Sequence, residues 1–517
     1  MWYVYLSEKR SMEVLEGWRS SELRGKKHAL VLPITMQAHI AGILRLCTDL
    51  ATRGVAISFV AGAREVAVLK ENEELRELDF HLISYEDFAP SGGSEQLHEK
   101  FNNPFEFIAV AQKVFDPVLE KLVADQRAGL PGPTCLISDR LLAFAQDVAN
   151  ELNIPHYQFY SCGAHFVRIL QEYPKLLADG TLKLHEDFRT GKVSIAEYEG
   201  HLNIAGLPPL RWKEILNPIK LGLQMFLDVA DRIDEVDGLI VNTFYEMDAP
   251  QVDAIRQRWE GDPQGKTRQL FLVGPLSNAA NFKDQSFVSD SSRPGHDCLQ
   301  WLDSRQPDSV LYICFGSLVR FTIEQIHELA IALEASGHDF LWVLSRGFSG
   351  KPFSDLDEIL PPNFRSRTRD RGLILDGWVP QLHVLSHPST GGFVTHCGWN
   401  SAIEGVTTGV PMIAWPQLPN DQGTVCRHLV DELKIAVEVG GSGKFNFLYD
   451  AEIQSVVRNL VGREELEDAV RFLLSEQGND MRARVRELKK RADAAVAEGG
   501  ARGKAMDDIV QSIPTHN

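Results

Sequence analysis

The sequence of 517 residues lacks long hydrophobic runs, paired cysteines and an excess of basic residues. No stretch approaches the ~18 apolar residues that a membrane helix needs, so no membrane span is expected. The seven cysteines are scattered without C-x-x-C spacing, which indicates reduced thiols rather than a disulfide framework or a metal site. Acidic residues outnumber basic ones by 71 to 53, and the net charge of −18 repels phosphate backbones. Nucleic acid is therefore not an expected partner.

The composition is that of a soluble globular protein. Apolar residues make up 44% and charged residues 24%, and the length suits two or three domains. Residues 1–27 contain no unbroken apolar stretch, so we expect an N-terminal extension rather than a secretory signal, and we assign it no function. We expect a cytoplasmic protein, and a monomer.

Short apolar runs alternate with helical periods from residue 28 onward, which is typical of an open parallel α/β sheet. Residues 276–294 are polar and predict an exposed linker between two such series. The expected strands before the linker are 28–34, 55–61, 133–139, 237–244 and 269–275, with helices over 40–53 and 141–152. Those after it are 309–317, 340–345, 372–378, 391–396 and 410–416, with helices over 322–336 and 400–408.

The predicted fold is α/β, with two Rossmann-like doubly wound domains facing across a cleft. Residues 28–275 would form the first domain and residues 295–490 the second. Residues 491–517 would form a helical tail that packs back on the first domain. Ligands of such sheets bind at the carboxyl ends of the strands, so the cleft is the expected site.

The segment from Trp378 to Gln422, WVPQLHVLSHPSTGGFVTHCGWNSAIEGVTTGVPMIAWPQLPNDQ, carries the most chemistry. A strand ends there in the turn HCGWNS, which opens a helix whose unpaired N–H groups and dipole favour an anion. We expect Asn400 and Ser401 as N-cap residues and His396 as a further donor, which together would cradle a diphosphate. Glu404 could accept from ribose hydroxyls, and Trp378 offers a face for a base. On residue chemistry alone, core aromatics and an interior histidine remain an equal alternative.

The order of the motifs resolves this alternative. W-x-P-Q, L-x-H-P, G-x-F-x-T-H-C-G-W-N-S, E-G, G-V-P-M, W-P and D-Q resemble the signature box of plant secondary-product UDP-glycosyltransferases. FGS at 315–317, DGLIVNTFYEMD at 237–248 and VGPL at 273–276 resemble further family segments. The resemblance implies the two-Rossmann-domain inverting type of enzyme, known as GT-B, with a UDP-sugar as co-substrate and no metal.

Carried over residue by residue, the resemblance also implies a donor site. Trp378 would stack on uracil, and Val379 would pair with it through its backbone. Gln381 and Glu404 would hold the ribose. His396, Asn400, Ser401 and Ser317 would hold the diphosphate, and Trp399, Asp421 and Gln422 the sugar hydroxyls. A glutamine at the place of Gln422 favours glucose in the family.

One insertion departs from the family pattern. Between Pro416 and Asp421 the sequence carries one residue more than usual, within QLPN. A bulge there would keep Asp421 and Gln422 in place; otherwise Asn420 and Asp421 would face the sugar.

His39 follows the first strand in TMQAHIAG, at the expected cleft edge. Inverting transfer needs a base to take the acceptor's proton, and a neutral imidazole suits that role. Asp139 ends the strand 133–139 and would orient the imidazole. The loop resembles the family's G-H-x-x-P, with Ala38 in place of the glycine and Gly42 near the place of the proline. Arg140 stands where the family often has an aromatic residue close by, which we expect to affect acceptor preference.

Two other motifs are expected to have no catalytic role. Asp355-Leu356-Asp357 matches the D-x-D of metal-dependent transferases, but it follows no buried strand and indicates a solvated loop. GGSGK at 440–444 lacks the first glycine and the hydroxyl residue of a phosphate-binding loop.

The sequence therefore predicts transfer of a sugar, with glucose favoured, to a hydroxyl of a small lipophilic flavonoid, phenolic or terpenoid. The acceptor would lie against loops such as 86–104 and 160–225. Two alternatives remain: a UDP-sugar epimerase, which would act on the UDP-sugar alone, and a catalytically weak UDP-sugar-binding protein on the same fold.

Overall fold

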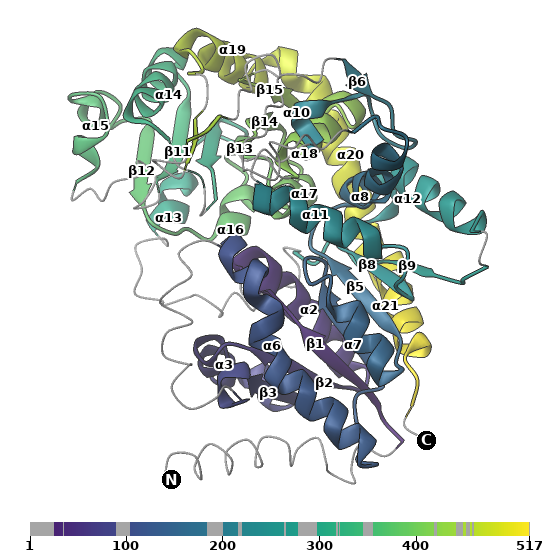
Figure 1. Ribbon diagram of the computed structural model, residues 1–517. Helices are drawn as coiled ribbons and strands as arrows, with labels where there is room; N and C mark the ends of the chain where they lie inside the picture. Colours follow the sequence, from purple (N-terminus) through teal and green to yellow (C-terminus); the bar gives the residue numbers. More distant parts are fainter. Residues whose placement is uncertain are drawn as a thin grey trace.

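The computed structural model describes most of the chain. The described residues are 25–34, 36–88, 104–182, 200–215, 220–262, 265–277, 297–316, 319, 321–344, 355–417, 421–440, 448–450, 455–457 and 460–515. They form two parallel sheets with helices packed around them (Figure 1), which confirms the predicted α/β class with two Rossmann-like sheets.

The first sheet has the strand order β3-β2-β1-β4-β5-β8-β9, and every neighbouring pair is parallel. We refer to this sheet and its helices α2 to α12 as the first unit. Its strands are β1 (Lys27–Leu32), β2 (Val55–Ala61), β3 (Phe80–Ser84), β4 (Cys135–Asp139), β5 (His156–Tyr160), β8 (Gly238–Val241) and β9 (Gln269–Leu272). Its helices are α2 (Gln37–Thr52), α3 (Ala63–Lys70), α4 (Glu73–Arg76), α6 (Pro104–Arg127), α7 (Ala145–Leu152), α8 (Ala164–Ala178), α10 (Trp212–Ile215), α11 (Lys220–Arg232) and α12 (Tyr245–Glu260).

The second sheet has the order β12-β11-β10-β13-β14-β15 and is also parallel throughout. With helices α13 to α20 it forms the second unit. Its strands are β10 (Val310–Cys314), β11 (Asp339–Leu344), β12 (Gly372–Asp376), β13 (Thr390–Thr395), β14 (Met412–Ala414) and β15 (Ala436–Glu438). Its helices are α13 (Asp297–Asp303), α14 (Ile323–Ser336), α15 (Phe364–Arg367), α16 (Gln381–Ser386), α17 (Trp399–Thr408), α18 (Gln422–Arg427), α19 (Arg463–Leu474) and α20 (Asn479–Val496). Two small antiparallel ribbons lie outside these sheets. One pairs the two-residue strands β6 (His201–Leu202) and β7 (Leu210–Arg211), and the other pairs the three-residue strands β16 (Leu448–Asp450) and β17 (Ser455–Val457).

Helix caps explain several element boundaries. Thr322 precedes α14 and its side chain accepts a hydrogen bond from the backbone N–H of Gln325, while Gly337 ends the helix in the left-handed region at φ 76°. The predicted helix over 141–152 begins only at Ala145, because Asp139 Oδ1 accepts from the N–H of Leu141 and holds the chain in a turn.

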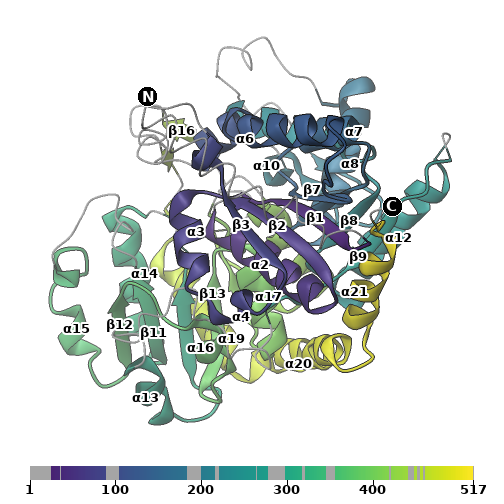
Figure 2. The same cartoon turned by 90° about the horizontal axis from the view of Figure 1, so that it is seen from below.

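The last helix, α21 (Ala501–Ser512), returns to the first sheet. It lies beside α2 and β9 (Figures 1 and 2), and Met506, Ile509 and Ile513 are buried in the hydrophobic cluster beneath α2. Tyr157 donates a hydrogen bond to the carbonyl of Ser512 at 3.0 Å. The chain therefore crosses from the second unit back to the first at its end.

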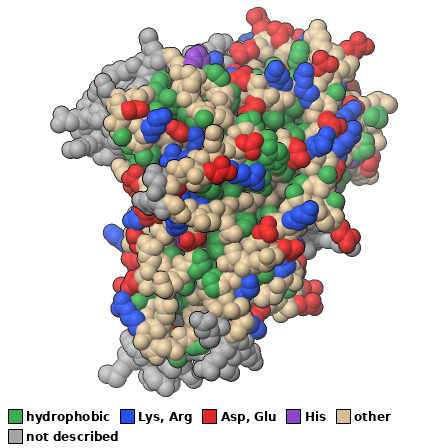
Figure 3. Space-filling view, turned by 90° about the vertical axis from the view of Figure 1, so that its right-hand side faces the viewer, with side chains coloured by type: hydrophobic (Ala, Val, Ile, Leu, Met, Phe, Trp, Pro, Cys, Tyr) green, Lys and Arg blue, Asp and Glu red, His purple; other side chains and the backbone are tan. Residues whose placement is uncertain are grey.

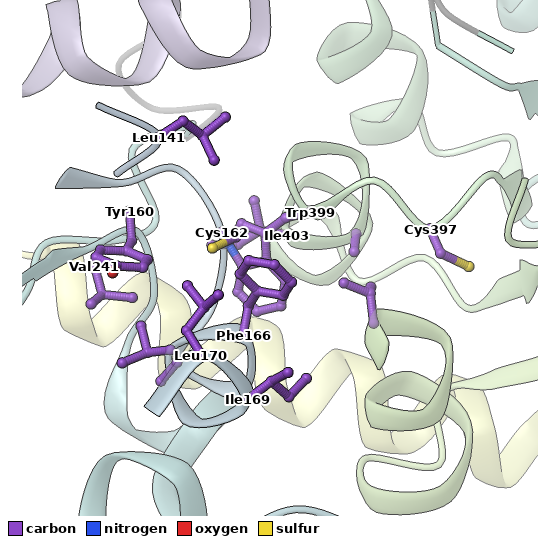
Figure 4. Packing of buried hydrophobic residues seen from close by; sticks show 14 of the residues in the cluster. Leu141, Tyr160, Cys162, Phe166, Ile169, Leu170, Val241, Cys397, Trp399 and Ile403 are labelled. Carbon is purple, nitrogen blue, oxygen red and sulfur yellow. The ribbon is translucent and has the colours of Figure 1, made fainter. Parts of the chain in front are cut away.

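The two units share a core as well. One hydrophobic cluster contains Phe166 and Leu170 of α8 together with Trp399 and Ile403 of α17 (Figure 4). On the surface, acidic and basic side chains are interspersed over the face that Figure 3 shows. No helix among the described residues combines the length and the apolar character that a membrane crossing requires.

Three strands of the two parallel sheets were not predicted from the sequence, namely β3, β5 and β15, and neither were the two small antiparallel ribbons. The sequence of β5, HYQFY, has no aliphatic residue, yet all five residues are buried. His156 and Gln158 can be buried there because they bond to Gln146, Ser138 and the Arg140 carbonyl. The expected linker beyond residue 277, and residues 1–24 of the expected extension, lie outside the described part of the chain.

Candidate active site

His39 and Asp139 meet at the carboxyl edge of the first sheet. Strands β1 and β4 are neighbours, His39 lies in the first turn of the helix after β1, and Asp139 is the last residue of β4. Nδ1 of His39 donates to Asp139 Oδ2 at 2.7 Å, and the two residues are 7% and 0% exposed. Since Nδ1 carries the donated proton, the lone pair of the neutral ring lies on Nε2.

Ser161 adds a third group to this pair. Its Oγ lies 3.4 Å from Nδ1 of His39, and it directly follows β5, the strand next to β4. We did not predict it, because β5 was not recognised in the sequence. The adjacency of strand ends is the signal that would have found it.

His396 follows β13 in the second unit and is clamped between two glycines. A Cβ on Gly316 would lie 3.0 Å from the imidazole, and a Cβ on Gly398 would lie 2.5 Å from Nε2. This enclosure lowers the pKa of His396 to about 4, so the ring is neutral at pH 7, and its Nδ1 has no hydrogen-bond partner in the described structure. A neutral ring held this way can donate one hydrogen bond to an anion. Ser317, predicted beside it, lies outside the described residues.

The helix after His396 begins earlier than predicted. Gly398 is the N-cap of α17, so Asn400 and Ser401 lie in the first turn and the prediction of these two as caps was wrong. A glycine fits here because any side chain would meet His396. The N–H groups of the first turn have no acceptors within the helix, and they point, with the positive end of the helix dipole, out of its start.

Gln381 joins the predicted ribose residues into one network. Its Nε2 donates to Ser401 Oγ at 3.1 Å and to Glu404 Oε2 at 2.8 Å, and Tyr312 donates to its Oε1 at 3.2 Å. Burial raises the pKa of Glu404, although Gln381 and Arg45 act in the opposite direction. Arg45 extends from α2 of the first unit and also donates to Ser277 at 3.0 Å. The sequence predicted Gln381, Ser401 and Glu404 as site residues but did not indicate Tyr312 or Arg45.

Trp378 and Val379 follow β12 after a glycine in the left-handed region, Gly377 at φ 110°. The backbone of Gly377 is tied to Leu344 at 3.0 Å. The Trp378 side chain is partly exposed, whereas Val379 is buried. The tryptophan therefore retains free surface.

The three residues predicted for the sugar hydroxyls are placed differently from one another. The indole N–H of Trp399 donates to the carbonyl of Asn242 at 2.7 Å, and the ring packs against Gly163 of the first unit. Gln422 is buried, and its Oε1 accepts from the N–H of Gln417 at 2.8 Å. Only Asp421, which directly precedes α18, keeps a partly exposed side chain. The inserted stretch at residues 418–420 lies outside the described residues.

A buried charged cluster between the units was not predicted. Nε2 of His428 lies 3.1 Å from Asp248 Oδ1 of α12, and its Nδ1 donates to Glu432 at 3.0 Å. The ring stacks on His165 of α8 with 5.4 Å between centroids. Burial opposes protonation of His428, but its hydrogen bonds to Asp248 and Glu432 outweigh burial and raise its pKa to about 9. The cluster therefore carries a charged histidine at neutral pH.

The D-x-D motif is a solvated loop, as predicted. Asp355 caps a short 3-10 turn and Asp357 lies within it; both are exposed, and both approach Arg365. Among the described residues, no group of three or more His, Cys, Asp or Glu side chains is arranged to hold a metal ion. The GGSGK motif lies outside the described residues from residue 441 onward.

Comparisons with known proteins identify relatives of this chain in sequence and in fold. The family profile described as UDP-glucoronosyl and UDP-glucosyl transferase matches residues 275–447. Scopoletin glucosyltransferase of Nicotiana tabacum is 30% identical, over 95% of this chain and 99% of its own length. Anthocyanidin 5,3-O-glucosyltransferase of a Rosa hybrid cultivar is 34% identical, over 80% of each chain. The structure of Phytolacca americana UGT2, complexed with UDP-2fluoro-glucose and pterostilbene, superimposes with a TM-score of 0.73 at 26% identity, covering 94% of this chain and 99% of the other.

Proposed function

Because this chain belongs to the plant secondary-product UDP-glycosyltransferases, we propose that it transfers glucose from UDP-glucose to a hydroxyl of a small phenolic, flavonoid or terpenoid. The observation that supports a working transferase is the buried 2.7 Å hydrogen bond between His39 and Asp139, opposite the donor segment. Glucose is supported by the glucosyltransferases among its relatives and by the glutamine at position 422.

His39 acts as the base of the reaction. Its Nε2 takes the proton of the acceptor hydroxyl while the acceptor oxygen forms a bond to the anomeric carbon. The bond between that carbon and the diphosphate oxygen breaks, UDP leaves with the electron pair, and the configuration inverts. Asp139 holds the ring through Nδ1 and stabilises the imidazolium that forms.

The second unit holds the donor. Trp378 stacks on uracil, the Val379 backbone pairs with it, and Gln381 with Glu404 holds the ribose. His396 and the start of α17, with Asn400, Ser401 and Ser317, bind the diphosphate. Asp421, the Gln422 amide and the Trp399 backbone contact the sugar. These neutral donors and the helix dipole stabilise the leaving diphosphate without a metal.

We also propose a domain organisation, a cellular location and an oligomeric state. Residues 28–275 bind the acceptor, 276–294 link the domains, 295–490 bind the UDP-sugar, and 491–517 form the tail on the first domain. The enzyme works in the cytoplasm as a monomer.

Mass spectrometry tests the reaction. The purified protein is incubated with UDP-glucose and a panel of flavonols, simple phenols and terpenols, and a gain of one hexose on an acceptor is expected. A change of the UDP-sugar in the absence of acceptor would instead indicate the epimerase. Tight UDP binding without any product, for every UDP-sugar tried, would indicate the binding protein.

A further inference from the structure

Arg140, the residue after the predicted catalytic aspartate, is a buried cation at the carboxyl edge of the first sheet. Its backbone N–H donates to the Phe159 carbonyl at 3.0 Å, and its carbonyl accepts from Gln158 at 3.2 Å. The side chain is 5% exposed, and its guanidinium lies 4.6 Å from the centre of the Phe166 ring. Backbone and ring together fix the position of the charge.

Two of the three guanidinium nitrogens lack hydrogen-bond acceptors. Nε and Nη1 are buried and have no partner in the described structure. The Phe166 ring, over which the guanidinium carbon lies, attracts the charge but supplies no acceptor oxygen. A buried charged donor without an acceptor is costly, so a structural role alone does not account for it.

The other two buried arginines among the described residues pair with carboxylates. Arg168 donates to Gln171 at 2.8 Å and to Glu172 at 2.6 Å. Arg427 contacts Glu214 at 3.2 Å and Asp431 at 2.9 Å, although its Nε also lacks a hydrogen bond. Arg140 differs from both because no carboxylate of the described residues forms an ion pair with it.

The surroundings of Arg140 belong to the reaction site. Burial acts to lower the pKa of Arg140, but its neighbours Cys162, Asp421 and Asp139 outweigh burial and raise it. Asp139 holds His39, and Asp421 is the partly exposed residue predicted for the sugar. Figure 4 shows Cys162 and Phe166 close to Trp399 of the second unit. The charge therefore follows the aspartate that holds the base and lies within electrostatic range of Asp421.

From this arrangement we propose that Arg140 binds a carboxylate carried by one of the two substrates, and so determines specificity in the transfer reaction. The inference rests on the proposed function. A guanidinium forms charge-assisted hydrogen bonds to a carboxylate, and such bonds are stronger than bonds to a hydroxyl. The carboxylate belongs either to the acceptor, as in a hydroxybenzoic acid, or to C6 of a uronic acid donor.

Two arms of one experiment distinguish these sources. In the acceptor arm, UDP-glucose is used with 4-hydroxybenzoate and 4-hydroxycinnamate against their methyl esters. In the donor arm, a methyl ester acceptor is used with UDP-glucuronate against UDP-glucose. The kcat/KM ratio of charged to neutral substrate is measured for the wild type, Arg140→Met and Arg140→Lys. Arg256→Met is the matched control, because that exposed arginine also lies over an aromatic ring, Tyr245 at 5.9 Å.

We expect the wild type to prefer the charged substrate at least about tenfold in one arm. Arg140→Met should reduce the ratio of charged to neutral substrate to about one. Arg140→Lys should retain only part of the preference for the charged substrate, since lysine keeps the positive charge but lacks the planar guanidinium group. Arg256→Met should leave the ratio unchanged. A wild type without preference in either arm, or a preference that survives in Arg140→Met, overturns the proposal.

The experiment can distinguish failure of the proposed function from failure of the proposed carboxylate binding by Arg140. If the wild type transfers no sugar, calorimetry of 4-hydroxybenzoate and of UDP-glucuronate against the wild type and Arg140→Met still decides. A loss of affinity confined to the variant supports carboxylate binding, and equal affinities overturn it. Thermal unfolding checks that Arg140→Met folds; if it does not, Arg140→Lys provides the comparison.

Discussion

His428 lies with its Nε2 3.1 Å from Asp248 Oδ1, and this buried contact joins the second unit to the first. Asp248 also accepts from the N–H of Ala164 at 2.9 Å, at the start of α8. Glu432 bonds both His428 and Gln251. The helices that meet between the two units are therefore held by charge as well as by apolar packing.

This contact makes stability depend on pH. The pKa of His428 is about 9 in the folded protein against 6.5 in an unfolded chain. Its stabilisation is therefore complete below about pH 6.5 and is lost as pH rises through 9, and a shift of this size corresponds to about 3 kcal/mol. Asp248 acts oppositely: its contacts with His165 and His428 outweigh burial and lower its pKa, so its contribution is lost as pH falls below its unfolded pKa of 3.8.

The free energy of unfolding, measured with denaturant from pH 6 to 10, tests the predicted loss of stability at alkaline pH. The wild type should lose stability across this range, and His428→Gln should lose less by about 3 kcal/mol, because the variant has no proton to lose there. Parallel curves for the two proteins would exclude His428 as the source.

The catalytic pair predicts a separation of chemistry from binding. His39→Ala should lower kcat by about 10² to 10⁴ while the Kd for UDP stays within about twofold. His81→Ala is the matched control, because His81 also contacts an aspartate, Asp79 at 2.9 Å, on the surface. Stopped-assay kinetics and calorimetry measure both quantities. Equal losses of activity and UDP affinity would give His39 a structural role.

The exposed face of Trp378 predicts a stacking contribution to donor affinity. Trp378→Ala should weaken UDP binding by about 1–3 kcal/mol, and Trp378→Phe should recover most of it because a ring face is retained. Calorimetric titration with UDP checks this. An unchanged Kd in Trp378→Ala would remove it from the donor site.

The close packing of two glycines around His396 predicts that UDP binding is sensitive to a side chain at Gly398. In Gly398→Ala the new Cβ would lie 2.5 Å from Nε2 of His396, so the imidazole must move. We expect UDP affinity to fall by about tenfold or more, as expected for one misplaced donor to a charged group. Gly462→Ala is the control, because Gly462 is also a helix N-cap with nothing within 4 Å of the new Cβ. Similar UDP affinities in the two variants would contradict the clamp.

Metal removal should have no effect if neutral donors stabilise the diphosphate. Treatment with EDTA is expected to leave kcat within about twofold, and added Mg²⁺ should not raise it further. A loss of activity on chelation, restored by a divalent cation, would reject the proposed mechanism.

Sequence reasoning predicted those parts of the site that depend on contiguous segments. Strand ends are local, so the placement of His39 and Asp139 at one sheet edge followed from the run of strands. The segment from Trp378 to Gln422 likewise carries its strand, turn and helix in one stretch. The cap of α17 was misplaced because the contact that favours Gly398 is with His396, two residues earlier, and it depends on the conformation of the turn between them.

The parts of the site that were missed depend on how the two units pack against each other. Three residues of the buried charged cluster lie far apart in the chain and meet only when the units pack, so no local pattern indicates them: His165, Asp248 and His428. The indole of Trp399 was expected near the sugar, but the proximity of Asn242 directs its N–H to the first unit. Arg140 was noted for its identity, whereas its burial and its free donors became visible only in three dimensions.

The return of α21 to the first sheet has a consequence for the order of synthesis. The apolar face beneath α2 is closed by Met506, Ile509 and Ile513, which leave the ribosome after everything else that this unit contains. The first unit therefore cannot complete its core while the rest of the chain is being made, and the second unit can form before the first is finished. A nascent chain stopped before residue 501 would expose that groove and become a substrate for chaperones.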